Sequence, residues 1–473
     1  MSTCVGPQRK TAGAAIEHNM ILRDAFRSGW VAVVMLTSSL RGADWPQFLG
    51  PDRTGVSVEK GLLRAWPAGG PKEQWSVEVG AGFGGAAVRD GEVYVLDRVG
   101  ERQDVLRCLD LKTGKALWTC AYDAPGKLPY DGSRSVPTVD ERFVFTVGPF
   151  GHLQCIDRQS HRIVWSKHMV NDFKDAEIDR DEKPRTREEK LARAQVPEWG
   201  VTQSVVLYKD LVIVAPQTEK VGLAGYEKGT GKLRWASGYV GRNWYSHVSP
   251  WLMRLGGADQ VVMLAQPSDP EKSPASAPPA VITSIDPDTG GILWKAQTPR
   301  PYKIPIPQPL RIGEDRVFIT GGYGLGCMVL KVAKEGGQWK AEVVFRKNTV
   351  ASHIHSPVLY DGRIYVTSFR EHGAANTGLV CVDENGELVW QTGPKLQFDF
   401  GGFIVADGLI FIMNGKTGEL HLLEITSGGY KLLAKAKVLA GEGGTTWAPL
   451  ALSEGRLIVR DQEQMKCLDV RTP

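Results

Sequence analysis

The sequence lacks most of the features that mark metal-binding, redox or nucleic-acid-binding proteins. Its seven cysteines include no adjacent pair and no Cys-x-x-Cys motif, which removes the commonest signatures of zinc and dithiol sites. Basic and acidic side chains number 57 and 53, for a net charge of +4, so nothing indicates a nucleic-acid partner. The apolar run at residues 30–36 is too short to span a bilayer. We therefore expect no nucleic-acid partner and no stable membrane span.

The same short apolar run fits a secretory signal peptide. Arg23 and Arg27 precede it, and Ala43 follows at a plausible cleavage site. We therefore expect residues 1–43 to be an upstream extension and signal peptide, residues 44–72 to be an entry segment, and the mature chain to be exported to the periplasm or cell envelope. The alternative is a disordered tail on a cytosolic protein.

Glycine (54) and tryptophan (14) are plentiful, and both recur in one repeated pattern. Residues 106–118 read LRCLDLKTGKALW, and residues 153–165, 223–235 and 282–294 repeat this order of apolar strand, Asp-x-x-Thr-Gly-like turn and Trp-containing strand. Another alternating hairpin stands upstream of such units, as at residues 88–95, 359–366 and 404–412. Two hairpins per repeat make a four-stranded unit, and repeats of this length are typical of propeller blades. The repeat tryptophans are Trp118, Trp165, Trp235, Trp294 and Trp390, each expected to pack between neighbouring sheets.

The two ends of the chain complete each other. The last copy, at residues 465–473, stops before its tryptophan strand, whereas Trp75 stands at the start of the domain with no hairpin before it. We predict that residues 73–79 supply the outer strand of the last blade. The expected fold is therefore all-β: an eight-bladed β-propeller of four-stranded antiparallel sheets over residues 73–473, with a charged insert at residues 172–195.

The repeat resembles that of the pyrroloquinoline-quinone (PQQ)-like β-propeller family, a superfamily that includes quinoprotein alcohol dehydrogenases and proteins similar to BamB. The entry segment DWPQFLGPDRTG, residues 44–55, is similar to that of exported propellers of planctomycete-type bacteria. The resemblance implies the fold. It leaves two functions open, because catalytic and non-catalytic members share the repeat.

A quinoprotein dehydrogenase of this family uses PQQ and calcium in the central funnel, an Asp base and an adjacent Cys-Cys disulfide. This chain has no Cys-Cys pair, and its calcium ligands and base cannot be placed by motif. We therefore expect a non-catalytic binding or scaffolding protein, a monomer with no cofactor, no metal and no catalytic residues, that binds an envelope protein or a small molecule. The alternatives are a PQQ-dependent alcohol or sugar dehydrogenase and a metal-dependent hydrolase.

Four cysteines, at 108, 155, 381 and 467, occupy one register of the repeat, two residues before the turn acid. Other copies have Gly225 or Ser284 there, so the position requires a small side chain. We expect these cysteines to be buried thiols.

A second register, just before the innermost strand of each blade, should surround the central channel. It and its neighbourhood supply the predicted ligand-binding rim: Arg134, Trp199, Gln203, Tyr245, His247, Tyr323, His353, His355, Asp399 and Trp447. His353 and His355 could join His247 at a metal, as the hydrolase alternative requires. We instead expect them to hydrogen-bond within a water-filled channel.

Overall fold

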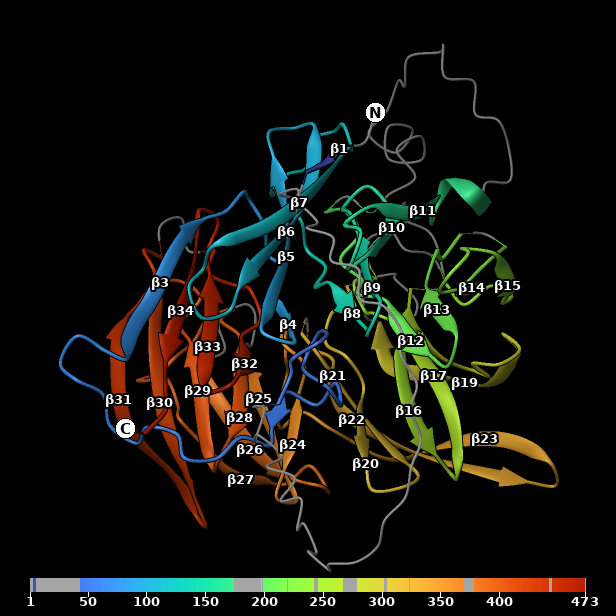
Figure 1. The fold of residues 1–473 in the computed structure, drawn as a ribbon. Coiled ribbons are helices and arrows are strands. Elements are labelled where there is room, and N and C mark those ends of the chain that lie inside the picture. The colour runs from blue at the N-terminus through green and yellow to red at the C-terminus, as the bar shows by residue number, and fades with distance from the viewer. Residues whose placement is uncertain are drawn as a thin grey trace, which may run out of the picture.

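The computed structural model describes residues 3–5, 43–173, 197, 199–218, 220–241, 246–266, 279–301, 304–322, 324–368, 378–441 and 445–472. Within these residues the chain forms eight antiparallel blades of four strands each, two of them extended by a fifth strand, set around a common centre (Figure 1). The inner strands of the first and second, fifth and sixth, and sixth and seventh blades touch, and the inner strand of the last blade touches that of the first. The predicted eight-bladed propeller is confirmed. Most of the charged insert, from residue 174, and most of residues 1–43 lie outside the described residues.

The blades follow one another along the chain, and each begins with a short inner strand. The first four blades are β4 (Ala87–Arg89), β5 (Glu92–Val99), β6 (Gln103–Asp110) and β7 (Ala116–Asp123); β8 (Thr138–Val139), β9 (Phe143–Val147), β10 (His152–Asp157) and β11 (Ile163–His168); β12 (Val206–Tyr208), β13 (Leu211–Val214), β14 (Ala224–Glu227) and β15 (Leu233–Ala236); β16 (Trp251–Leu255), β17 (Ala258–Ala265), β18 (Pro279–Ile285) and β19 (Ile292–Pro301). The next three are β20 (Leu310–Ile312), β21 (Arg316–Gly321), β22 (Gly326–Glu335) and β23 (Gln338–Lys347); β24 (Val358–Tyr360), β25 (Arg363–Ser368), β26 (Gly378–Asp383) and β27 (Leu388–Gln391); β28 (Phe403–Ala406), β29 (Leu409–Met413), β30 (Glu419–Thr426) and β31 (Gly429–Lys437).

The last blade joins both ends of the propeller. It contains β32 (Ala451–Ser453), β33 (Arg456–Arg460), β34 (Gln464–Asp469) and, from the other end of the chain, β3 (Lys72–Glu78). Trp75 lies opposite Cys467 in the antiparallel pairing of β3 with β34, which is the pairing that the sequence predicts. In Figure 1 the blue strand β3 lies beside the red strands of the C-terminal end. Three short elements complete the list: β1 (Thr3–Val5), which pairs with β7, β2 (Val56–Ser57), which pairs with β28, and the 3-10 helix η1 (Asn171–Phe173).

The repeated turn is held by its acidic residue. In the first blade the Asp110 carboxylate accepts hydrogen bonds from the backbone N–H groups of Lys112 (3.1 Å) and Thr113 (2.8 Å) and from the Thr113 hydroxyl (2.7 Å). Gly114 follows with φ of 69°, a conformation that glycine adopts without strain. This chemistry explains why Asp, Thr and Gly recur at fixed spacing.

Three repeat tryptophans reach into the turn of the next blade. The indole N–H of Trp75 donates to the Leu111 carbonyl (2.9 Å), that of Trp165 to the Lys228 carbonyl (2.8 Å) and that of Trp235 to the Pro287 carbonyl (3.1 Å).

The other repeat tryptophans use different contacts. Trp118 stacks on His161 of the next blade at 4.8 Å, Trp294 donates to Gln260 of its own blade (2.8 Å), and Trp390 packs on Tyr430 at 5.2 Å. The hydrophobic core lies between the sheets, as one cluster shows by joining Val93, Phe411 and Leu457 of three successive blades.

The cysteines at 108, 155, 381 and 467 are buried and free, as the sequence predicts. Burial raises the pKa of each thiol, for example that of Cys381 to about 11. These side chains therefore serve as small apolar groups.

Residues 44–62 of the entry segment cross the ring and are here called the N-terminal plug. It bonds to the first two blades through Trp45 and Pro46, whose partners are Val88 and Val139. It then passes to the seventh blade, where β2 pairs with β28, and to the last blade, where Leu62 bridges to Arg471. No helix in the described part of the chain is long and apolar enough to cross a membrane.

Candidate functional site

Residues just before the inner strands converge on one end of the central channel. Serine side chains fix these segments to one another across blade boundaries. The backbone N–H of Val136 donates to Ser204 Oγ (3.0 Å), that of Ser204 to Ser249 Oγ (2.9 Å) and that of Gln308 to Ser356 Oγ (3.1 Å). Because each link joins neighbouring blades, the side chains beside these serines are held rigidly around the axis.

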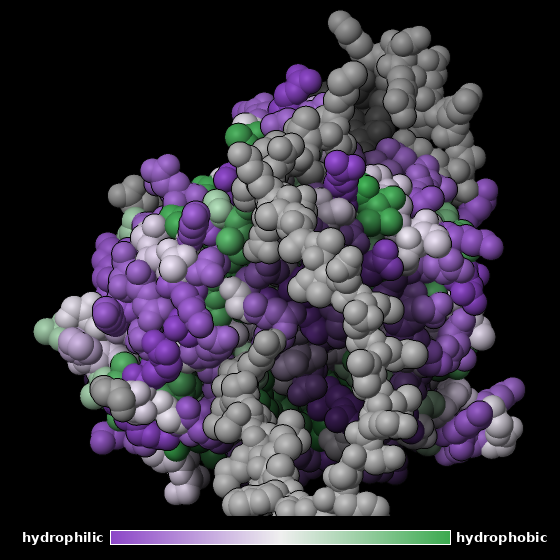
Figure 2. Space-filling view, in the orientation of Figure 1, coloured by the Kyte–Doolittle hydropathy of each residue, from purple (hydrophilic) through white to green (hydrophobic). Residues whose placement is uncertain are grey.

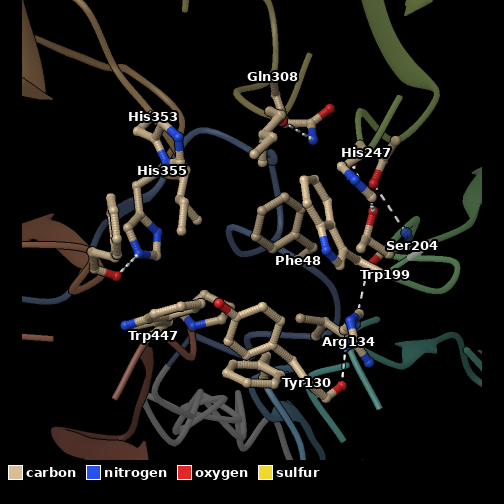
Figure 3. Close-up of a pocket in the computed structure, with 18 residues that line it drawn as sticks. Phe48, Tyr130, Arg134, Trp199, Ser204, His247, Gln308, His353, His355 and Trp447 are labelled. Atoms are coloured by element: carbon tan, nitrogen blue, oxygen red, sulfur yellow. Dashed lines mark hydrogen bonds between the residues drawn. The ribbon is translucent and has the colours of Figure 1, made fainter. Parts of the chain in front are cut away.

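These segments enclose a cavity of about 340 Å³, here called the funnel (Figure 3). Aromatic, aliphatic and neutral polar side chains make up most of its wall. The lining residues are Phe48, Phe83, Tyr130, Arg134, Val136, Trp199, Thr202, Ser204, His247, Ser249, Ile306, Gln308, His353, Ile354, His355, Phe400, Trp447 and Pro449. The outer face drawn in Figure 2 is by contrast largely hydrophilic, with hydrophobic residues in small separate groups.

The N-terminal plug supplies the floor of the funnel. Phe48 projects from the plug into the cavity and packs edge-on against Trp251 at 6.0 Å. Arg53 anchors the plug: its guanidinium donates to the carbonyls of Val205 (3.0 Å) and Pro250 (3.3 Å) and lies 4.3 Å from the Trp251 ring centre. Burial lowers the pKa of Arg53 to about 9. Arg53 therefore fixes the segment that carries Phe48 at the cavity.

An aromatic cluster forms one wall. The centre of the Trp447 ring lies 5.3 Å from the ring centre of Phe83, 5.9 Å from that of Tyr130 and 5.2 Å from that of Phe400. Arg134 is placed over Phe83 at 5.4 Å. Such contacts keep large aromatic faces fixed at the cavity surface.

Two of the five N–H groups of the Arg134 guanidinium donate within the protein. Its two terminal nitrogens donate to the backbone carbonyls of Gly132 and Tyr130. Burial lowers the pKa of Arg134 to about 10, so the group is still charged at neutral pH.

The three histidines of the funnel are neutral at neutral pH. Burial, helped by Arg134, lowers the pKa of His247 to about 3, and burial lowers those of His353 and His355 to about 4. His355 Nε2 donates to the Phe400 carbonyl (2.7 Å), and the His353 ring stacks on that of Phe400 at 4.9 Å.

The structure brings together six of the ten residues predicted for the rim. Arg134, Trp199, His247, His353, His355 and Trp447 line the funnel. Gln203 is buried beside it, donating to Gln217 (2.8 Å), and Asp399 is not a lining residue. Tyr245 and Tyr323 lie outside the described residues.

Sequence reasoning missed several lining residues. Phe83, Gln308 and Phe400 stand just before inner strands, so the register that found Arg134 would have found them too. Phe48 and Tyr130 come from irregular segments, where no repeat signal exists.

The described residues do not form a metal site. Nowhere among them do three His, Cys, Asp or Glu side chains come together to hold a metal ion. Hard cations such as calcium prefer carboxylate and amide oxygens, and the described lining of the funnel includes the Gln308 amide but no carboxylate. The described lining therefore does not fit the calcium of a calcium-bound quinone. His247, His353 and His355 do not come together to hold the metal that the hydrolase alternative requires.

A family model described as outer membrane protein assembly factor BamB (PQQ_2) matches residues 101–374 and 278–472. The chain belongs to this family. No curated protein matches the sequence.

Several solved structures share the fold at low sequence identity. A europium-containing methanol dehydrogenase is similar with a TM-score of 0.60 and 12% identity, covering 88% of this chain and 89% of that chain. A quinohemoprotein alcohol dehydrogenase from Comamonas testosteroni is similar with a TM-score of 0.58 and 14% identity, covering 91% of this chain and 81% of that chain. BamB from Moraxella catarrhalis is similar with a TM-score of 0.53 and 12% identity, covering 85% of this chain and 98% of that chain. Dehydrogenases and BamB therefore share this fold.

Proposed function

We propose that this chain is an exported, non-catalytic binding propeller whose funnel holds a small ligand or an inserted part of a partner protein. The observation that carries this proposal is an aromatic cavity, partly lined by Phe48 of the anchored plug, with neutral histidines and no carboxylate in its described lining. Concave apolar sites with a few convergent polar groups are the usual places for ligands. The family description as an assembly factor supports a binding role.

The competing function is a quinoprotein alcohol dehydrogenase, favoured by the likeness to two alcohol-oxidising proteins. It requires a base near the substrate. The histidines are neutral but weakly basic because burial lowers their pKa values, and no described carboxylate lines the funnel.

The test is a thermal-shift screen of the full chain against ligands of several chemical classes, run beside a dye-linked alcohol oxidation assay with added PQQ and calcium. A ligand at 100 times its Kd adds about 2.7 kcal/mol of stability, so a binder raises Tm measurably. We expect at least one class to raise Tm in the wild type and not in Trp447→Ala. Alcohol oxidation that depends on both additives would overturn the proposal.

A further inference from the structure

Two buried hydrogen-bond acceptors of the funnel have no partner in the part of the chain that the structure describes. The Thr202 hydroxyl donates to the His247 carbonyl (3.0 Å) and therefore accepts from His247 Nδ1 (3.2 Å). Since the ring is neutral, Nε2 is left as an acceptor, and it is buried with no partner among the described residues. A buried acceptor without a donor destabilises the protein, and a ligand that supplies the donor removes this cost.

Gln308 provides a second unused acceptor on the neighbouring loop. Its side-chain N–H points back to the Ile306 carbonyl (3.4 Å), and its Oε1 is buried with no partner among the described residues. The two loops are joined directly, because the His247 backbone N–H donates to the Pro305 carbonyl (2.7 Å). His247 and Gln308 thus form one polar wall of the funnel.

His355 adds a third acceptor. Its Nε2 carries the proton that is donated to the Phe400 carbonyl (2.7 Å), so the neutral ring offers Nδ1 as an acceptor. In Figure 3, Gln308 and His247 lie on one side of the cavity, Trp447 and Tyr130 lie on the other, and His355 lies near Trp447.

Charge narrows the class of ligand. A cation would meet the buried charge of Arg134, and the described lining of the funnel contains no carboxylate to contact the cation directly. An anion would find one N–H group of each terminal nitrogen of Arg134 already donating to a backbone carbonyl, and it would be repelled by the acceptors His247 Nε2 and Gln308 Oε1. A neutral ligand avoids both costs.

We propose that the funnel binds a neutral saccharide of one or two rings, with its hydroxyls donating to His247 and Gln308 and its C–H face packed on the aromatic wall of Trp447, Tyr130 and Phe83. Hydroxyl groups supply the missing donors, and the C–H faces of a sugar ring are attracted to the negative faces of aromatic rings. The cavity of about 340 Å³ is at the small end of ligand pockets, which suits one or two rings. This inference rests on the funnel being a binding site.

The test is isothermal titration calorimetry of the full chain with neutral mono- and disaccharides of glucose, galactose, mannose, xylose and N-acetylglucosamine. Choline, galacturonate and catechol serve as cationic, anionic and planar aromatic probes. We expect at least one neutral saccharide to bind. Gln308→Leu should weaken its binding about tenfold, since it removes one hydrogen bond, and Trp447→Ala should weaken it more, with Trp447→Phe in between.

Gln338→Leu, at an exposed position on β23, is the matched control and should bind as the wild type does. Circular dichroism and melting curves would show that each variant is folded. Binding of choline, galacturonate or catechol without any saccharide would overturn the inference and leave the proposed binding function standing. Saccharide binding unchanged in Gln308→Leu and Trp447→Ala would place the sugar elsewhere. If no probe binds in calorimetry and no ligand raises Tm in the thermal-shift screen, both the saccharide inference and the proposed binding function would be overturned.

Discussion

At the scale of single residues, one contact decides how blades are spaced. The glycine that ends the repeated turn lies directly against the tryptophan of the preceding blade. A Cβ added at Gly231 would lie 2.7 Å from Trp165, and one added at Gly290 would lie 2.6 Å from Trp235. Glycine is therefore needed twice over at these positions, for its positive φ and for its missing side chain.

Two glycines of one turn allow a matched test. Gly231→Ala should lower the free energy of unfolding by about 1–3 kcal/mol, because it forces positive φ on alanine and overpacks Trp165. Gly229→Ala should change it by less than about 0.5 kcal/mol, since nothing lies within 4 Å of the added Cβ and its φ is not positive. Urea unfolding followed by tryptophan fluorescence measures both. Equal effects of the two substitutions would contradict this account.

The sequence repeat predicted these turns and tryptophans because the residues that form each turn, and the tryptophan that follows, lie within a few positions of one another. What it could not predict was the partner of each indole. Trp294 bonds within its own blade to Gln260, and His161 takes the place of the turn glycine against Trp118, with φ of 60°.

At the scale of elements, the N-terminal plug is an irregular segment that behaves as part of the core. Arg53 is buried without a carboxylate partner among the described residues, so the carbonyls of Val205 and Pro250 and the face of Trp251 replace its hydration. The plug reaches the last blade as well, where the Glu59 carboxylate accepts from the Gly455 N–H (2.5 Å).

Removing the anchor should loosen the plug. Arg53→Met keeps most of the volume but deprives two buried carbonyls of a charged donor, so we expect a loss of about 1–3 kcal/mol and faster proteolysis within residues 44–62. Arg64→Met, which removes exposed pairs with Glu424 and Asp407, should cost less than about 1 kcal/mol. Mass spectrometry of limited digests gives the cleavage rates. Identical rates in both variants would show that Arg53 is not the anchor.

The path of the plug explains the main omission in the predicted site. Residues 44–62 have no alternation and no helical period, because Pro and Gly interrupt them, so sequence reasoning could name the segment but not its route. Phe48, the floor of the funnel, was missed for that reason. The rim residues of the inner-strand register were found because every blade repeats the same position.

At the scale of the whole molecule, stability depends on the blade shared by the two ends. Trp75 sits at this seam, bonded to Leu111 of the first blade and opposite Cys467 of the last. The ring was predictable from two incomplete repeats that complement each other. The funnel's ligand was not, since its chemistry comes from side chains that only the closed ring brings together.

The seam should be sensitive to truncation of its tryptophan. Trp75→Ala should destabilise the protein by about 3–5 kcal/mol, as expected for a large buried aromatic side chain, and broaden the melting transition. Trp339→Ala, on the half-buried hairpin strand β23, should cost clearly less. Differential scanning calorimetry compares them. A Trp75→Ala protein that melts as the wild type does would mean that β3 is dispensable for closure.

The shared blade also bears on how the protein is made. The Gln74 side-chain amide donates a hydrogen bond to the Asp469 carboxylate (2.9 Å) across a sequence separation of 395 residues. Contacts between residues so far apart in sequence raise the contact order of a fold and slow its folding. During translation β3 emerges long before its partner β34. The nascent chain therefore carries an unpaired strand edge until β34 has been made, and at that stage a chaperone could bind it.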